Sequence, residues 1–192
     1  VADGGSSIVI DHCTLQATST TPTTNVASGG AATLIASVTH TSALADRASI
    51  VVVDSSVAAV VRRMSIYGAM VGVVRGSSNV TNHAGIVMAR CTLAANASNH
   101  SSGAWVAVIH SSSIVSNHSF IVVLDCTVFA SSETRSAAAM VAVVHGGSVV
   151  TDGSLLTVER CNVTANASDT TSDANVATVR DASVLQHGGM IL

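Results

Sequence analysis

Three segments of the chain share one pattern, and that pattern decides the fold: IVMARCTL at 86–93, IVVLDCTV at 121–128 and LTVERCNV at 156–163. Their cysteines, Cys91, Cys126 and Cys161, follow one another at intervals of 35 residues. The phrase is rich in Val and Ile, which favour strands because branched side chains fit a pleated surface. A β-rich phrase repeated at this interval is typical of a solenoid, in which each repeat packs on the next.

Two upstream copies extend the pattern toward the N-terminus. IVIDHCTL at 8–15 contains Cys13, and IVVVDSSV at 50–57 carries Ser55 at the cysteine position. Cys13 and Ser55 are 42 residues apart, so we assign an insertion to the Ser/Thr-rich stretch 16–32 of the first copy.

A second β-rich phrase follows the first in every repeat. Its copies are IASVTHTSAL at 35–44, MVGVVRGSSNV at 70–80, WVAVIHSSSIV at 105–115, MVAVVHGGSVV at 140–150 and NVATVRDASVL at 175–185. Neither phrase leaves room for an amphipathic helix of ordinary length. Two or three strands per repeat predict an all-β chain, a right-handed parallel β-helix (β-solenoid) of about five coils of roughly 35 residues.

We interpret residues 1–192 as a single β-helix segment, and we expect it to be a fragment of a longer protein. The repeats are placed at 4–46, 47–82, 83–117, 118–152 and 153–192.

Stacking turns each column of the repeat alignment into a ladder of neighbours roughly 4.8 Å apart. The first ladder is Cys13, Ser55, Cys91, Cys126 and Cys161. We expect it to point inward, as buried thiols that fill space like small apolar groups. There is no CxxC pair to suggest a zinc site, and parallel side chains on successive coils suit a disulfide poorly.

A charged column comes directly before the cysteine column. It consists of His12, Asp54, Arg90, Asp125 and Arg160 and alternates in sign over its last four members. We expect it to face outward and to fix the register, because stacked charges of one sign would repel. Coincidence among five residues is the alternative.

One apolar column has the opposite parity to the cysteine column. It consists of Ile8, Ile50, Ile86, Ile121 and Leu156. Either both faces of this strand are covered, or a bend between the two columns resets the alternation of side chains.

Composition excludes several classes of protein. The chain is 48% hydrophobic and 10% charged, which argues against disorder. Its net charge is −3 and its basic residues form no run, which argues against binding to nucleic acid. No apolar run reaches the length of a membrane-spanning helix.

A basic column is predicted in the second phrase: His40, Arg75, His110, His145 and Arg180. Stacked histidines could share a metal or bind an acidic ligand, but no carboxylate column accompanies them. We therefore expect a solvated strand end. A turn column follows it: Asp46, Asn82, Asn117, Asp152 and His187. We assign no catalytic, cofactor-binding or metal residue, and we expect no cofactor.

Glycosylation sequons are the more informative local motif. Six asparagines begin N-x-S/T, where the Ser/Thr content would give roughly two by chance. The candidates for glycosylation are Asn96, Asn99, Asn117, Asn162 and Asn166. Asn79 falls in an apolar column and is expected to stay bare. Simple Ser/Thr enrichment is the alternative, but the pattern favours a secreted or cell-surface protein.

The phrases IVIDHCTL, IVVLDCTVFA and MVAVVHGGSVV resemble the trypanosomatid dispersed gene family of very large surface proteins. The resemblance covers nearly the whole chain but depends on the style of the repeats. It implies a pectin-lyase-like β-helix in the ectodomain of a larger membrane protein, with a role in adhesion. It offers no catalytic residue to transfer to this sequence.

We therefore expect a non-catalytic cell-surface module for structure and adhesion. Its partner would be a host cell-surface or matrix protein or a glycan, with no nucleic acid and no membrane span in this segment. Variable loops would form the contact surface, with Tyr67 and Trp105 near their ends. The alternatives are a carbohydrate-active enzyme, lyase or hydrolase, on the same scaffold, and a degenerate fragment without activity. The loops lie at 16–32, 58–69, 94–104, 129–139 and 164–174.

Overall fold

The computed structural model confirms a parallel β-helix, and the residues that it describes contain strands and no helix. It describes residues 4–19, 33–35, 37–61, 68–98, 102–133, 136–168 and 172–192. The chain makes about four turns, slightly fewer than the five coils expected. The final pass through the first sheet is only the two-residue strand Met190–Ile191. The right-handed sense stays a prediction from the crossover rule.

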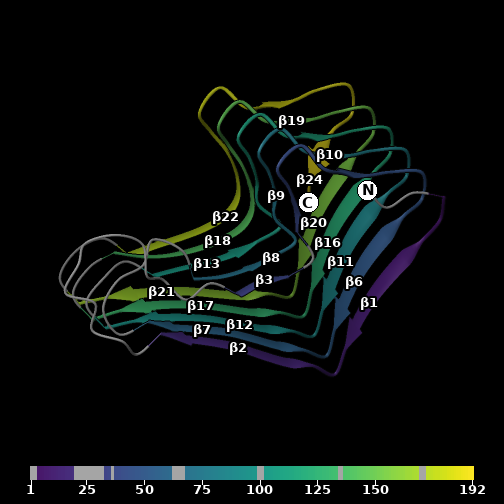
Figure 1. The fold of residues 1–192 in the computed structure, drawn as a ribbon. Coiled ribbons are helices and arrows are strands. Elements are labelled where there is room, and N and C mark those ends of the chain that lie inside the picture. The colour runs from purple at the N-terminus through teal and green to yellow at the C-terminus, as the bar shows by residue number, and fades with distance from the viewer. Residues whose placement is uncertain are drawn as a thin grey trace.

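Four parallel sheets form the walls of the coil, and each receives one or two strands per turn (Figure 1). The first sheet contains β1 (Ser7–Asp11), β6 (Ser49–Val53), β11 (Gly85–Ala89), β16 (Phe120–Leu124), β20 (Leu155–Glu159) and β24 (Met190–Ile191). The second contains β2 (Thr14–Ser19), β7 (Ser56–Val61), β12 (Thr92–Ala97), β17 (Thr127–Ser132) and β21 (Asn162–Ala167).

The third sheet is bent, so most coils cross it as two short strands. It contains β3 (Thr33–Ile35), β4 (Val38–Thr39), β8 (Ala69–Val71), β9 (Val74–Arg75), β13 (Ser102–Val106), β14 (Ile109–His110), β18 (Ala137–Val144) and β22 (Ser172–Val179). The fourth contains β5 (Ala43–Leu44), β10 (Asn79–Val80), β15 (Ile114–Val115), β19 (Val149–Val150) and β23 (Val184–Leu185).

The cysteine column stacks in single file, as the sequence predicted. The residue after each member donates its backbone N–H to the column residue of the preceding coil, as in Thr127 N to Cys91 O at 2.9 Å. Cys91 and Cys126 are buried in the core. Cys13, in the first coil, is exposed. The prediction of an inward ladder therefore holds for the inner coils.

A corner between the first and second sheets explains the two apolar columns of opposite parity. All five residues of the charged column have φ between 47° and 52°. This left-handed conformation turns the chain, so that Ile50 before the corner and Ser55 after it are both buried. Of the two alternatives, the bend is correct, and the charged column lies at this corner.

Charge alternation at this corner produces two bidentate ion pairs on the outside of the coil. Arg90 donates from Nε and Nη2 to the two carboxylate oxygens of Asp54 at 2.7 and 2.6 Å. Arg160 does the same to Asp125 at 2.6 and 3.0 Å. These hydrogen bonds hold the pKa of both carboxyl groups below the usual range. The pairs join adjacent coils and so favour the observed register.

A column of serines, which the sequence analysis did not identify, lines the corner between the third and fourth sheets. The backbone N–H of each serine except the last donates to the hydroxyl of the serine on the next coil, as in Ser78 N to Ser113 Oγ at 3.2 Å. The Ser113 hydroxyl in turn donates to His110 O at 2.9 Å. Because Ser78 and Ser113 are fully buried, these bonds satisfy polar groups that cannot reach water. The column is Ser42, Ser78, Ser113, Ser148 and Ser183.

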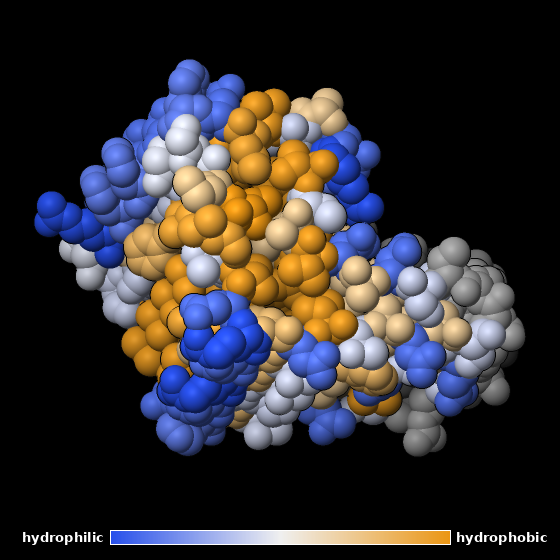
Figure 2. Space-filling view, turned by 180° about the vertical axis from the view of Figure 1, so that it is seen from behind, coloured by the Kyte–Doolittle hydropathy of each residue, from blue (hydrophilic) through white to orange (hydrophobic). Residues whose placement is uncertain are grey.

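The core is a stack of small and medium aliphatic side chains, and the end coils leave part of it uncovered. Val141 is fully buried, whereas Val176, its partner in β22, is 45% exposed because no described coil lies above it. Ile8 and Val9 are similarly exposed in β1. Figure 2 shows a face on which apolar side chains gather at the centre, with hydrophilic ones around them.

Candidate functional site

The third sheet bends at one residue per coil, and we call the outer side of this bend the elbow (Figure 1). Gly72 and its equivalents in the later coils, Ala107, Ala142 and Ala177, have φ of 66°, 53°, 53° and 53°. A left-handed residue interrupts the alternation of side chains. Positions two before and one after the bend, such as Met70 and Val73, therefore both face outward into the elbow.

The elbow holds a second apolar cluster, separate from the interior core. It consists of Met70, Val73, Val108, Met140 and Val143, with Trp105 packed against it. All but Trp105 are at most 4% exposed, although they lie on the outer side of the sheet. The bend brings side chains from both arms together, and this packing buries the cluster.

A pair of histidines borders this cluster. The rings of His110 and His145 stack in parallel with centroids 5.1 Å apart, on adjacent coils. Trp105 stands perpendicular to both, with centroids at 5.6 and 6.4 Å. Nδ1 of His110 lies 2.8 Å from Ser111 Oγ, while Nε2 of each imidazole is buried without a hydrogen-bond partner. An imidazole N–H that lies next to an indole ring makes a weak polar contact, and this contact partly compensates for the missing hydrogen bond.

Burial lowers the pKa of both imidazoles. It lowers the pKa of His110 to about 4, and the charges of His145 and Arg75 act in the same direction. The pKa of His145 is also lowered, mainly by burial and then by Arg180, while Asp181 opposes the shift. Both rings are therefore neutral at pH 7, and they stack without repelling each other.

An arginine flanks each end of the histidine pair. Arg75, on the coil before His110, forms no ion pair within the described part of the chain. Arg180, on the coil after His145, lies 3.8 Å from Asp181 through its Nε and donates from Nη2 to Met140 Sδ at 3.6 Å. The elbow thus combines two guanidinium groups and two imidazoles with one partly exposed indole.

The structure corrects the predicted membership of this basic column. Thr39, and not His40, pairs with Arg75, because the first and second coils are offset by 36 residues at this point. His40 begins the neighbouring turn, with φ of 55°. The prediction of a solvated strand end is also wrong for the middle coils, where His110 and His145 pack against Trp105.

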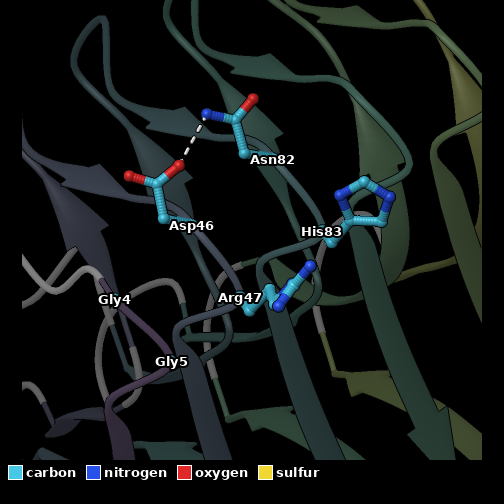
Figure 3. Close-up of a pocket in the computed structure, with 6 residues that line it drawn as sticks. All are labelled: Gly4, Gly5, Asp46, Arg47, Asn82 and His83. Atoms are coloured by element: carbon cyan, nitrogen blue, oxygen red, sulfur yellow. Dashed lines mark hydrogen bonds between the residues drawn. The ribbon is translucent and has the colours of Figure 1, made fainter.

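The turn column at the corner between the fourth and first sheets is structural, as predicted. Asn82 donates from Nδ2 to Asp46 Oδ1 at 2.8 Å, and Asn117 donates to Asn82 Oδ1 at 2.9 Å. A glycan on the Asn117 nitrogen would therefore replace a donor of this ladder. Figure 3 shows the shallow groove at this corner, with Arg47 and His83 beside the Asp46–Asn82 hydrogen bond. The residues that line this groove are glycines and polar side chains, so it offers no apolar surface to a ligand.

The other sequons are spread over the outer surface. Asn162 and Asn166 are exposed on β21, and Asn96 is half-buried on β12. Asn79 is exposed on β10, because its apolar column faces outward. The structure therefore gives no reason to expect that Asn79 stays without a glycan. Asn99 and Tyr67 lie outside the described residues, as do parts of the predicted loops. The loop prediction is wrong for much of the described parts, where β12 and β13 enter 94–104 and β21 and β22 enter 164–174.

One group of potential metal ligands occurs in the part of the chain that the structure describes: Asp11, His12 and Asp54. Its members already contact other side chains, since Arg90 binds Asp54 and His12 Nδ1 lies 2.5 Å from Asp11 Oδ1. We interpret it as the exposed end of the ion-pair ladder.

Comparisons with known proteins find no family model, curated protein or solved structure that matches this chain. Across the described ranges, no helix has the length and apolar character needed to cross a membrane.

Proposed function

We propose that this chain is a non-catalytic recognition module of a surface or secreted protein, a rigid β-helix whose elbow binds a glycan of a host cell or matrix. The observation that carries the proposal is the position of Trp105, the single tryptophan of the chain. It lies on the outer side of the third sheet, partly exposed, with polar nitrogen groups around it. An indole can receive the apolar face of a sugar ring while neighbouring donors bind its hydroxyl groups.

The scaffold suits recognition because it holds these groups in place. Trp105 is in β13, which pairs with β8 and β18 on both sides. His110 ends β14 and His145 directly follows β18, and these two strands pair with each other across coils. Little conformational entropy is lost when a ligand binds groups that are already ordered.

The elbow favours binding over catalysis. Glycoside hydrolysis commonly uses two carboxyl groups on either side of the bond that is cleaved. Among the described residues of the elbow, Asp181 is the carboxylate near the histidine pair. Incubation with polygalacturonate and with glycosaminoglycans, followed by analysis for cleavage products, tests the alternative of a carbohydrate-active enzyme. Sustained turnover would refute the proposal.

Binding itself is tested with a glycan array and with cultured host cells. The matched variant is Trp105→Met, because Met70 and Met140 occupy the same column on the neighbouring coils and the fold already accepts methionine there. We expect unchanged circular dichroism and a loss of glycan binding of at least about tenfold, from the removed aromatic contact. Equal binding by the wild type and by Trp105→Met would exclude the elbow as the site.

A further inference from the structure

We infer that the ligand of the elbow is an acidic polysaccharide, lying along the coil axis with its carboxylate or sulfate groups on Arg75 and Arg180. This inference rests on the proposed function and adds the chemical class of the ligand. It follows from the order of side chains on four successive coils: guanidinium, imidazole, imidazole, guanidinium.

Arg75 and Arg180 are more available to bind an anion than the arginines of the charged column. Arg75 has no carboxylate partner among the described residues. Arg180 makes a long contact of 3.8 Å with Asp181 and donates to Met140 Sδ at 3.6 Å. By contrast, Arg90 and Arg160 are each held by two short hydrogen bonds to a carboxylate. A planar guanidinium binds carboxylate or sulfate through two parallel hydrogen bonds, so the elbow offers two such positions.

The spacing of these positions favours a polymer over a small anion. Arg75 and Arg180 are three coils apart, which corresponds to roughly 14 Å at about 4.8 Å per coil. A single sulfate ion cannot bridge that distance, whereas a chain with a charge on successive sugars can. Trp105 lies between the two arginines along the axis, where an uncharged part of a sugar ring would pack.

The histidine pair makes the binding depend on pH. A bound anion beside His110 and His145 stabilises their protonated forms and raises the pKa of each, which burial otherwise lowers. The complex therefore takes up protons, and by linkage the affinity increases as the pH falls from 7.5 toward 5. Asp181 faces His145 at 3.9 Å and also favours its protonation.

The experiment measures binding of the 192-residue chain to immobilised heparin, hyaluronan and neutral dextran at several salt concentrations. We expect binding to one or both acidic polymers, none to dextran, and an affinity that decreases with salt. Arg75→Gln and Arg180→Gln should each weaken binding by about tenfold. Arg47→Gln, which removes an exposed arginine from a different corner, is the matched control and should bind like the wild type.

The outcomes separate the two proposals. Preference for heparin identifies sulfate as the recognised group, and equal binding of hyaluronan identifies carboxylate. Binding of neutral glycans with no effect of Arg75→Gln would overturn the acidic ligand and leave the recognition function intact. No binding to any glycan or host cell would overturn both. Equal loss in Arg47→Gln and Arg75→Gln would indicate non-specific charge attraction and would also overturn the inference.

Discussion

The serine column allows a test of how successive coils are joined. In Ser113→Ala, the Ser78 N–H loses its acceptor at 3.2 Å, and the bond from Ser113 Oγ to His110 O is also lost. Ser78 is fully buried, so its N–H cannot turn to water instead. An unsatisfied buried donor costs about 1–3 kcal/mol and a lost hydrogen bond about 1 kcal/mol. We expect a total decrease of about 2–4 kcal/mol in the free energy of unfolding.

Ser42→Ala is the matched control for this prediction. Ser42 belongs to the same column, but in the described structure no backbone N–H of another coil donates to its hydroxyl. Its own N–H keeps the bond to Ser78 Oγ at 3.3 Å. Urea denaturation followed by far-UV circular dichroism should show a loss below about 1 kcal/mol. If Ser113→Ala and Ser42→Ala lower the unfolding free energy equally, the serine column does not join the coils as argued.

Three further predictions concern accessibility, backbone space and pH. A thiol reagent should modify Cys13 in the native chain at once and Cys126 only after unfolding, because contacts with its neighbours and burial raise the pKa of the Cys126 thiol. Gly68→Ala should lower the melting temperature, since its Cβ would lie 2.4 Å from Gly103 O; a melting temperature equal to that of the wild type would contradict this packing. Acidification from pH 7 to pH 4 should destabilise the fold, because the unfolded His110 gains its proton near 6.5 and the native one only near 4. NMR titration of this imidazole measures the shift directly, and a native pKa of 6.5 would refute it.

Much of the fold could be predicted from the sequence, because similar phrases at nearly constant intervals fix which residues stack. The cysteine column and the pairing of Asp54 with Arg90 follow from counting alone. The inward orientation of Ile50 could not be predicted in this way. The same hydrophobic pattern fits a straight strand covered on both faces and a strand interrupted by a left-handed corner, and only the φ of Asp54 distinguishes them. His40 was misplaced for a related reason, since one extra residue in a coil shifts every later column.

The elbow could not be predicted, because its bend depends on alanines in a conformation that favours glycine. Ala107 and Ala142 carry φ of 53°, and nothing in their type marks a turn. Without the bend, Trp105 aligns with Met70 and Met140 and could equally belong to the interior. The sequence did contain one usable signal, the periodic serine beside the basic column, which marks a corner with buried backbone groups.

The tolerance of the first coil to extra residues has a practical consequence. β2 and β7 pair at a separation of 42 residues, from Thr14 to Ser56, while β3 and β8 pair at 36, from Thr33 to Ala69. The six additional residues thus fall between Ser19 and Thr33 and leave both neighbouring registers intact. We therefore expect that foreign peptides can be inserted between the second and third sheets, in this or any later coil, without changing the spacing between successive coils.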